Sequence, residues 1–169
     1  MQQGSFAGNG SVSSGAAVKG RHILVECYDA SYDALNDQNL IRNAMLRAVE
    51  EMQVTYLGDH FHKFAPQGVS GAVVIAESHL TIHTWPEDGY AAIDFFTCGH
   101  ADPHEGFMVL ARALGSATLK VVEMERGLPY ANGGGASARK VAEMVYTFGG
   151  SAVTVPGEVE ADAQVSLVG

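Results

Sequence analysis

Residues 71–98 constrain the fold most, because three strand-like patterns follow one another there with only short links between them. Residues 71–76 form a continuous apolar run, which is typical of a strand buried on both faces. Apolar and polar residues alternate over 80–85, and a third strand-like pattern covers 91–98. Links this short join antiparallel neighbours. The segment therefore predicts the centre of an antiparallel sheet.

The rest of the pattern adds strands and two helices. Strands are expected over residues 22–28, 54–64 with a bulge at Gly58, and 118–124. Asn36 or Asp37 can cap a helix that runs to about residue 52, and Asp102 followed by Pro103 begins a second helix that ends at Gly115. This order predicts an α+β domain, an antiparallel sheet with two helices packed on one face, in a two-layer sandwich.

The chain divides into three parts by composition. Residues 1–18 are rich in Gly, Ser and Ala without periodicity, so we expect a disordered leader. The domain should occupy 19–130. Residues 131–169 are expected to be a linker and a C-terminal extension, in which 136–148 suit a short helix with Val141, Met144 and Val145 on one side.

The charge balance narrows the classes of partner. With 10 Lys and Arg against 19 Asp and Glu, the chain carries −9 and no basic cluster, which argues against binding to nucleic acid. No apolar run is long enough to span a membrane, and the N-terminal residues lack the pattern of a signal peptide, so we expect none. Two cysteines do not make a disulfide framework, so we expect a cytoplasmic protein.

The motif Glu77-Ser78-His79, with His83 and Cys98 further on, places a hydroxyl, two imidazoles and a thiol in one strand-rich stretch. Such groups can perform covalent chemistry. A Ser-His-Asp hydrolase is not supported, because the strained G-x-S-x-G elbow is absent. A packed or solvated serine is the simplest alternative for Ser78, and an inert core thiol is the alternative for Cys98.

Metal binding is a weaker interpretation. The chain has His60-x-His62 and several later histidines, but its two cysteines lie 71 positions apart, unlike the tight pairs of zinc sites. His79 and His83 would share a strand face about 13 Å apart, too far to bind one ion. We therefore expect no metal.

The stretch from Phe64-Ala-Pro-Gln-Gly-Val-Ser70-Gly through Glu77-Ser78-His79-Leu-Thr-Ile-His83-Thr-Trp-Pro-Glu87 to Thr-Cys98-Gly resembles the prokaryotic S-adenosylmethionine decarboxylase proenzymes. The resemblance covers about residues 19–126. It implies a self-cleaving enzyme that cuts at Glu77-Ser78 and converts Ser78 into a pyruvoyl cofactor. The product would be the aminopropyl donor for spermidine and related polyamines.

The resemblance also implies residue roles. His83 would be the base for elimination, Ser70 would assist processing, and Cys98 would donate a proton to the substrate carbon. Phe64 would stack on adenine and Glu87 would hold the ribose hydroxyls, with Trp85 as a further substrate-binding residue. The family further implies dimers of the cleaved chain pair, with active sites near the subunit interface.

Two other functions remain open at this point. A sister pyruvoyl-dependent decarboxylase of arginine or ornithine would share the self-cleavage chemistry. A non-processing paralogue that acts only as a binding subunit would belong to a different class, and the intact set of Ser78, His83 and Cys98 argues against it.

Overall fold

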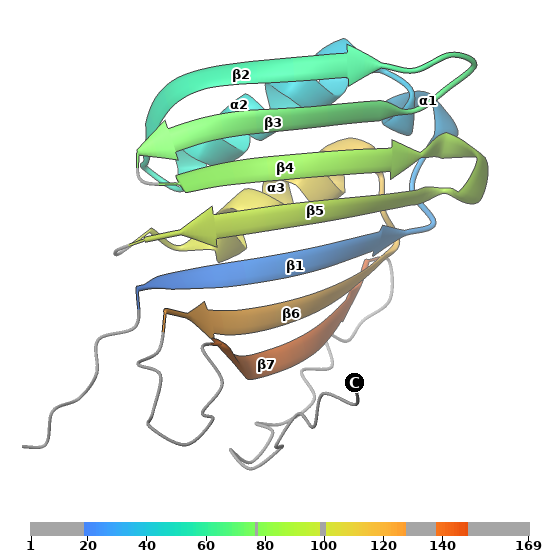
Figure 1. Ribbon diagram of the computed structural model, residues 1–169. Coiled ribbons are helices and arrows are strands. Elements are labelled where there is room, and N and C mark those ends of the chain that lie inside the picture. The colour runs from blue at the N-terminus through green and yellow to red at the C-terminus, as the bar shows by residue number, and fades with distance from the viewer. Residues whose placement is uncertain (1–18, 77, 99–100, 128–137, 149–169) are drawn as a thin grey trace, which may run out of the picture.

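The sheet is antiparallel and has seven strands in the order β2-β3-β4-β5-β1-β6-β7 (Figure 1). The structure is a computed structural model that describes residues 19–76, 78–98, 101–127 and 138–148. The strands are β1 (Gly20–Tyr28), β2 (Thr55–Lys63), β3 (Val69–Ala76), β4 (Ser78–Trp85), β5 (Tyr90–Thr97), β6 (Thr118–Arg126) and β7 (Ala138–Thr147). The predicted leader and residue Glu77 lie outside the described residues.

In the part of the chain that the structure describes, three α-helices lie on one side of the sheet (Figure 1). They are α1 (Tyr32–Leu35), α2 (Gln38–Glu51) and α3 (Pro103–Leu114). The side chain of Asp37 caps α2 by accepting from the backbone N–H groups of Asn39 and Leu40. Asp102 caps α3, and Gly115 ends it at φ 65°. The α+β sandwich and both predicted helices are confirmed, and the short α1 is an addition.

The core lies between the helices and one face of the sheet. In β4, Leu80 and Ile82 are fully buried against the helices, whereas Trp85 on the opposite face is 41% exposed. This confirms the alternation predicted for residues 80–85. None of the described helices is long and apolar enough to cross a membrane.

The second face of the sheet is not covered by any described helix, and we call it the open face. Its central members are Ser70, Ala72 and Val74 of β3, His79, Thr81, His83 and Trp85 of β4, Ala92, Asp94 and Phe96 of β5, and His22 and Leu24 of β1. The prediction that residues 71–76 are buried on both faces is wrong for the single chain, because Val73 is fully buried but Val74 is 48% exposed.

The predicted helix over 136–148 is wrong, since residues 138–147 form β7, which pairs with β6. The spacing of Val141, Met144 and Val145 suits a helix, but Met144 and Tyr146 alternate toward the core, and the Tyr146 ring lies 5.7 Å from that of Phe107. Pairing also satisfies the backbone of β6, which would otherwise be an edge strand. The tertiary context therefore decides this segment.

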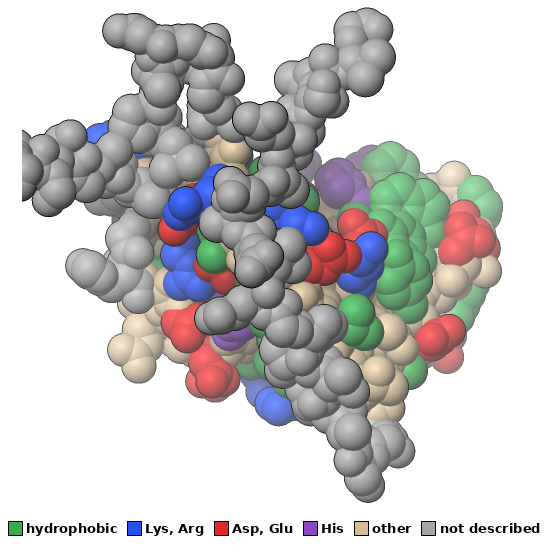
Figure 2. All heavy atoms as spheres, turned by 90° about the horizontal axis from the view of Figure 1, so that it is seen from below, with side chains coloured by type: hydrophobic (Ala, Val, Ile, Leu, Met, Phe, Trp, Pro, Cys, Tyr) green, Lys and Arg blue, Asp and Glu red, His purple; other side chains and the backbone are tan. Residues whose placement is uncertain are grey.

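Charged side chains gather on the β6–β7 edge (Figure 2). The ammonium groups of Lys120 and Lys140 lie 3.2 and 2.9 Å from the two carboxylate oxygens of Glu143, and Arg139 pairs with Glu125. Charged groups on an exposed strand discourage pairing with another chain. Among the described residues, β7 is the last strand on this side of the sheet.

Candidate active site

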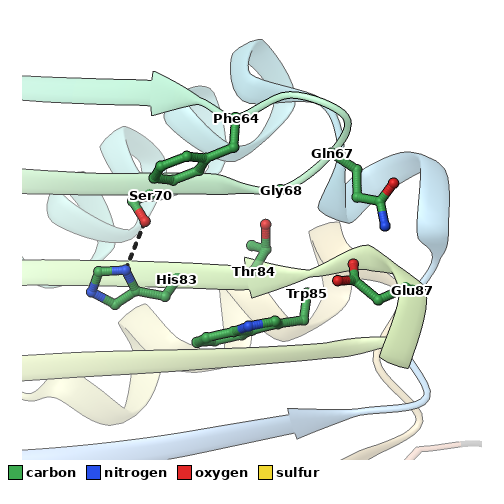
Figure 3. A pocket seen from close by; sticks show the side chains of 8 residues that line it. All are labelled: Phe64, Gln67, Gly68, Ser70, His83, Thr84, Trp85 and Glu87. Atoms are coloured by element: carbon green, nitrogen blue, oxygen red, sulfur yellow. Dashed lines mark hydrogen bonds between the residues drawn. The ribbon is translucent and has the colours of Figure 1, made fainter.

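A cavity of about 310 Å³ opens at the end of β4. Eight residues line it, from the β2–β3 loop, β3, β4 and the 3₁₀ helix η1 (Pro86–Asp88). They are Phe64, Gln67, Gly68, Ser70, His83, Thr84, Trp85 and Glu87 (Figure 3). Five residues that the sequence singled out, Phe64, Ser70, His83, Trp85 and Glu87, are thus brought together from a stretch of 24 positions.

Ser70 and His83 form the polar centre of this cavity. They are direct partners across β3 and β4, and the Ser70 Oγ lies 2.7 Å from the His83 Nδ1 (Figure 3). A hydrogen bond at Nδ1 fixes the ring orientation and leaves Nε2 to face another group. The pair can therefore present an oriented imidazole for proton transfer.

Two aromatic rings and a carboxylate surround this pair. Figure 3 shows Phe64 on one side of the opening, Trp85 on the other, and Glu87 at its far end. The Phe64 side chain is 48% exposed and Trp85 is 41% exposed. Exposed rings offer faces for a flat ligand, and an ionised carboxylate accepts hydrogen bonds from hydroxyl groups.

The loop that carries Phe64 is held by buried polar contacts. The Thr84 hydroxyl donates to the Leu35 carbonyl at 2.8 Å and accepts from the Val69 N–H at 2.8 Å. Gly68 donates its N–H to the Asn36 side chain at 3.2 Å and has φ 97°, which favours glycine. Sequence reasoning missed the contributions of Thr84 and Asn36, because each depends on a contact between distant segments.

The cleavage motif lies at the other end of β4. Ser78 is the first residue of β4 and pairs with Thr97 of β5, and Cys98 follows directly after that strand in a half-buried position. Glu77 lies outside the described residues. Ser78 has φ 147°, a backbone conformation that L side chains rarely adopt. Backbone strain of this kind is concentrated at functional sites.

The two ends of β4 are far apart within one chain. Ser78 and His83 are separated by five residues, or roughly 16 Å at the rise of a β-strand. The structure therefore groups the cavity residues together and leaves Ser78 and Cys98 as a second group. A proton transfer between His83 and Ser78 would not be direct within a single copy.

A network of polar side chains lies on the open face between the two ends. The Asp94 carboxylate lies 3.2 Å from the His22 Nε2 and accepts from the Thr81 hydroxyl at 3.0 Å. The hydrogen bond from His22, followed by that from Thr81, holds the pKa of Asp94 below its usual value. Sequence reasoning missed this network, which joins three strands. Within the described residues, no group of three or more side chains is arranged to hold a metal ion.

A concave pocket lined by aromatic rings and a few convergent polar groups is the usual form of a small-molecule site. The family model described as S-adenosylmethionine decarboxylase matches residues 21–127, and the chain belongs to this family. β7 lies beyond the matched segment.

Similar proteins carry the same description. The chain is 51% identical over 109 residues to the S-adenosylmethionine decarboxylase proenzyme of Thermotoga petrophila, covering 64% of this chain and 84% of that protein. It is 47% identical over 109 residues to the proenzyme of Anoxybacillus flavithermus, covering 64% and 88%. The crystal structure of the adenosylmethionine decarboxylase from Aquifex aeolicus superposes with a TM-score of 0.64 at 30% identity, over 71% of this chain and 100% of that chain.

Proposed function

We propose that this chain cleaves itself between Glu77 and Ser78 and then decarboxylates S-adenosylmethionine in the cytoplasm, for polyamine synthesis. The observation that carries the proposal is the strained φ of Ser78 at the start of β4, in a chain that belongs to the decarboxylase family. The name of the relatives, proenzyme, also supports processing. The strained serine with a half-buried Cys98 nearby fits a pyruvoyl group formed from Ser78.

Cleavage follows from the chemistry of a serine next to a peptide bond. The Ser78 hydroxyl attacks the Glu77 carbonyl carbon, the peptide C–N bond breaks, and an ester replaces the amide. A base then removes the α-proton of residue 78 and the ester leaves, for which an imidazole such as His83 is suited near neutral pH. Water then adds to the imine tautomer of the remaining enamine, ammonia leaves, and a pyruvoyl group is left on residue 78.

The pyruvoyl ketone supplies an electron sink when it is joined to the substrate amine, as pyridoxal phosphate does. The side chains of the protein bind the substrate and return a proton to it. Phe64 stacks on the adenine, Trp85 forms the opposite wall, and Glu87 accepts hydrogen bonds from the ribose hydroxyls. Cys98, beside the strand partner of Ser78, returns a proton to the substrate carbon after carbon dioxide leaves.

The active site is completed by a second copy of the chain. The two groups of residues lie at opposite ends of β4. A two-fold axis near Thr81 would place the start of β4 in one copy opposite the end of β4 in the other, with the sheets about 10 Å apart. The end of β4 that carries Ser78 and Cys98 in one copy would then lie opposite the cavity of its partner.

The apolar pattern of β3 supports a second copy as the occupant of the open face. Residues 71–76 have the composition of a strand buried on both faces, yet Val74 is 48% exposed in the single chain. Phe96 and Leu24 extend this apolar surface across the sheet. A surface of this kind rarely stays uncovered in solution.

Intact-mass measurement tests the proposal. Purified wild-type protein should give two fragments, residues 1–77 and 78–169, with a pyruvoyl group at the start of the second, and should release carbon dioxide from S-adenosylmethionine. Ser78→Ala should remain one inactive chain. Uncut wild-type protein would favour a binding subunit, and release from arginine or ornithine alone would identify the sister decarboxylase.

A further inference from the structure

Among the described residues, the hydroxyl of Thr97 departs from the rule that buried polar groups make hydrogen bonds. Thr97 is only 2% exposed, and its Oγ1 is the one fully buried side-chain polar atom of the described chain that has no hydrogen-bond partner. An unbonded hydroxyl in the interior costs stability. Such groups require an explanation, and a role in chemistry is one of the few available.

The position of Thr97 indicates which group it serves. It lies on β5 between two strand partners, Ser78 of β4 and Arg21 of β1. The guanidinium of Arg21 is already engaged, because its Nε donates to Glu123 at 2.6 Å. Of the two strand partners, Ser78 is therefore the one whose hydroxyl can form a hydrogen bond with Thr97. Directly paired strand residues have Cβ atoms about 4.5–5.5 Å apart, and hydrogen bonds between Thr and Ser across such pairs are a known contact.

The backbone of Ser78 explains why this contact is not made in the resting chain. At φ 147°, the Cβ does not take the direction of an ordinary strand residue. Because Ser78 and Thr97 are direct partners across the two strands, a change in this backbone angle changes the separation of their hydroxyl groups. The strained backbone of Ser78 and the unbonded hydroxyl of Thr97 therefore occur at directly paired positions.

We propose that Thr97 is a positioning residue for self-cleavage, whose hydroxyl accepts a hydrogen bond from the Ser78 hydroxyl and aims the Ser78 oxygen at the preceding peptide bond. This inference rests on the proposed cleavage at Ser78. The Ser78 Oγ forms a bond to the carbonyl carbon of the preceding residue, the C–N bond breaks, and the hydroxyl proton ends on the freed amine. Thr97 orients the attacking oxygen and is unchanged by the reaction.

Two substitutions separate positioning from packing. Thr97→Val keeps the shape and removes the hydroxyl, whereas Thr97→Ser keeps the hydroxyl and removes a methyl group from the interior. Cleavage is followed on a denaturing gel after a short pulse of cell-free synthesis. Melting temperatures are measured in the uncleavable Ser78→Ala background.

Thr97→Val should cleave about tenfold more slowly, the loss expected for one neutral hydrogen bond. Its melting temperature should equal or exceed that of the parent. Thr97→Ser should cleave within about threefold of wild type, a difference smaller than one such hydrogen bond, and should melt at a lower temperature. Thr97→Val should therefore have the slower cleavage and the higher melting temperature of the two variants.

Cleavage of Thr97→Val at the wild-type rate would overturn the positioning role while leaving the proposed function intact. Cleavage rates that simply follow the melting temperatures would also overturn it, as would a Thr97→Val protein that fails to fold. If wild-type protein itself stays uncut, the proposed function fails, and that result is distinct from the others.

Discussion

The two ends of β4 differ in how well their polar groups are satisfied. At the end that carries the cavity, Ser70 and His83 are joined at 2.7 Å and Thr84 makes two hydrogen bonds of 2.8 Å. At the other end, Ser78 has a strained backbone and Thr97 has an unbonded hydroxyl. Satisfied groups favour a preformed binding surface, whereas strain and unmet hydrogen bonds favour reaction.

The difference suggests separate tasks for the two ends. In the proposed function, the cavity end recognises the substrate and supplies a base, whereas the Ser78 end is cleaved and then carries the reacting group. Because roughly 16 Å of strand separate them, each task can be removed without removing the other. The predictions below use that separation, from the largest expected effect to the smallest.

Substitutions of His83 and Cys98 should block different stages. His83→Ala should accumulate uncut chain or an ester that hydroxylamine cleaves, since the acyl shift can precede proton removal. Cys98→Ala should still cut, at least in part, but decarboxylate about 100-fold to 10,000-fold more slowly, the range for loss of a positioned proton donor. Fragment masses and carbon dioxide release measure the two stages.

The matched control for His83 is His104→Ala, which removes a partly exposed imidazole from α3, on the helix side of the sheet and outside the cavity. It should cut and turn over as wild type does. A Cys98→Ala protein with the wild-type rate of decarboxylation would remove the proton-donor role from Cys98.

Substitution at Glu87 should affect substrate use without affecting cleavage. Glu87→Gln keeps the shape but removes the charge that strengthens hydrogen bonds to ribose hydroxyls. We expect kcat/KM for S-adenosylmethionine to fall by one to two orders of magnitude, about 1.4 kcal/mol for each order. Asp88→Asn is the control, because Asp88 is the next residue of η1 and does not line the cavity. Equal losses in both variants would argue against a specific contact from Glu87.

The strain at Ser78 can be measured without cleavage. Ser78→Gly and Ser78→Ala are both uncleavable, but glycine accepts a positive φ and alanine does not. The glycine variant should therefore have the larger free energy of unfolding, by about 1 kcal/mol. At Ser70, which lies in a regular strand, the same comparison should give the opposite order. Denaturant titration of the four proteins, with the Ser70 pair in the Ser78→Ala background, decides whether strain is confined to the cleavage end.

The smallest effect is expected at the Asp94 network between the two ends. Because the pKa of Asp94 is lowered in the folded chain, its carboxylate stabilises the fold above its unfolded pKa of about 3.9. This contribution is lost as the pH falls through the folded value. The difference in unfolding free energy between the Asp94 and Asp94→Asn proteins should therefore shrink below about pH 4. His22 and His79 also lie near this carboxylate. The free energy of unfolding of Asp94→Asn must therefore be measured over the same pH range as that of the parent.

The sequence alone predicted those helices and strands whose patterns lie within a few neighbouring residues. The caps Asp37 and Asp102 and the alternation from Leu80 to Trp85 each appear within a few residues, and each is confirmed. β7 was predicted as a helix because its strand character depends on pairing with β6. The apolar run of β3 indicated burial on both faces, although one chain covers only one of them.

The residues of the cavity could be chosen by resemblance, but their grouping could not. Ser78 and His83 are far apart because both lie on β4. Their spacing in the sequence did not show that the site is divided into two groups. Thr97 and Thr84 gave no sequence signal, and Asn36 was noted only as a possible helix cap, because their contacts depend on the neighbours that the fold supplies.

Mixing two inactive variants tests the central claim, that each active site joins the Ser78 end of one copy to the His83 end of another. Ser78→Ala and His83→Ala are unfolded, mixed in equal amounts and refolded together. If the site is shared, each mixed dimer contains one site with both Ser78 and His83 intact. Cleaved chain and decarboxylation of S-adenosylmethionine should therefore appear in the mixture. Neither should appear when either variant is refolded alone. A mixture that forms dimers but stays uncut and inactive would contradict the account.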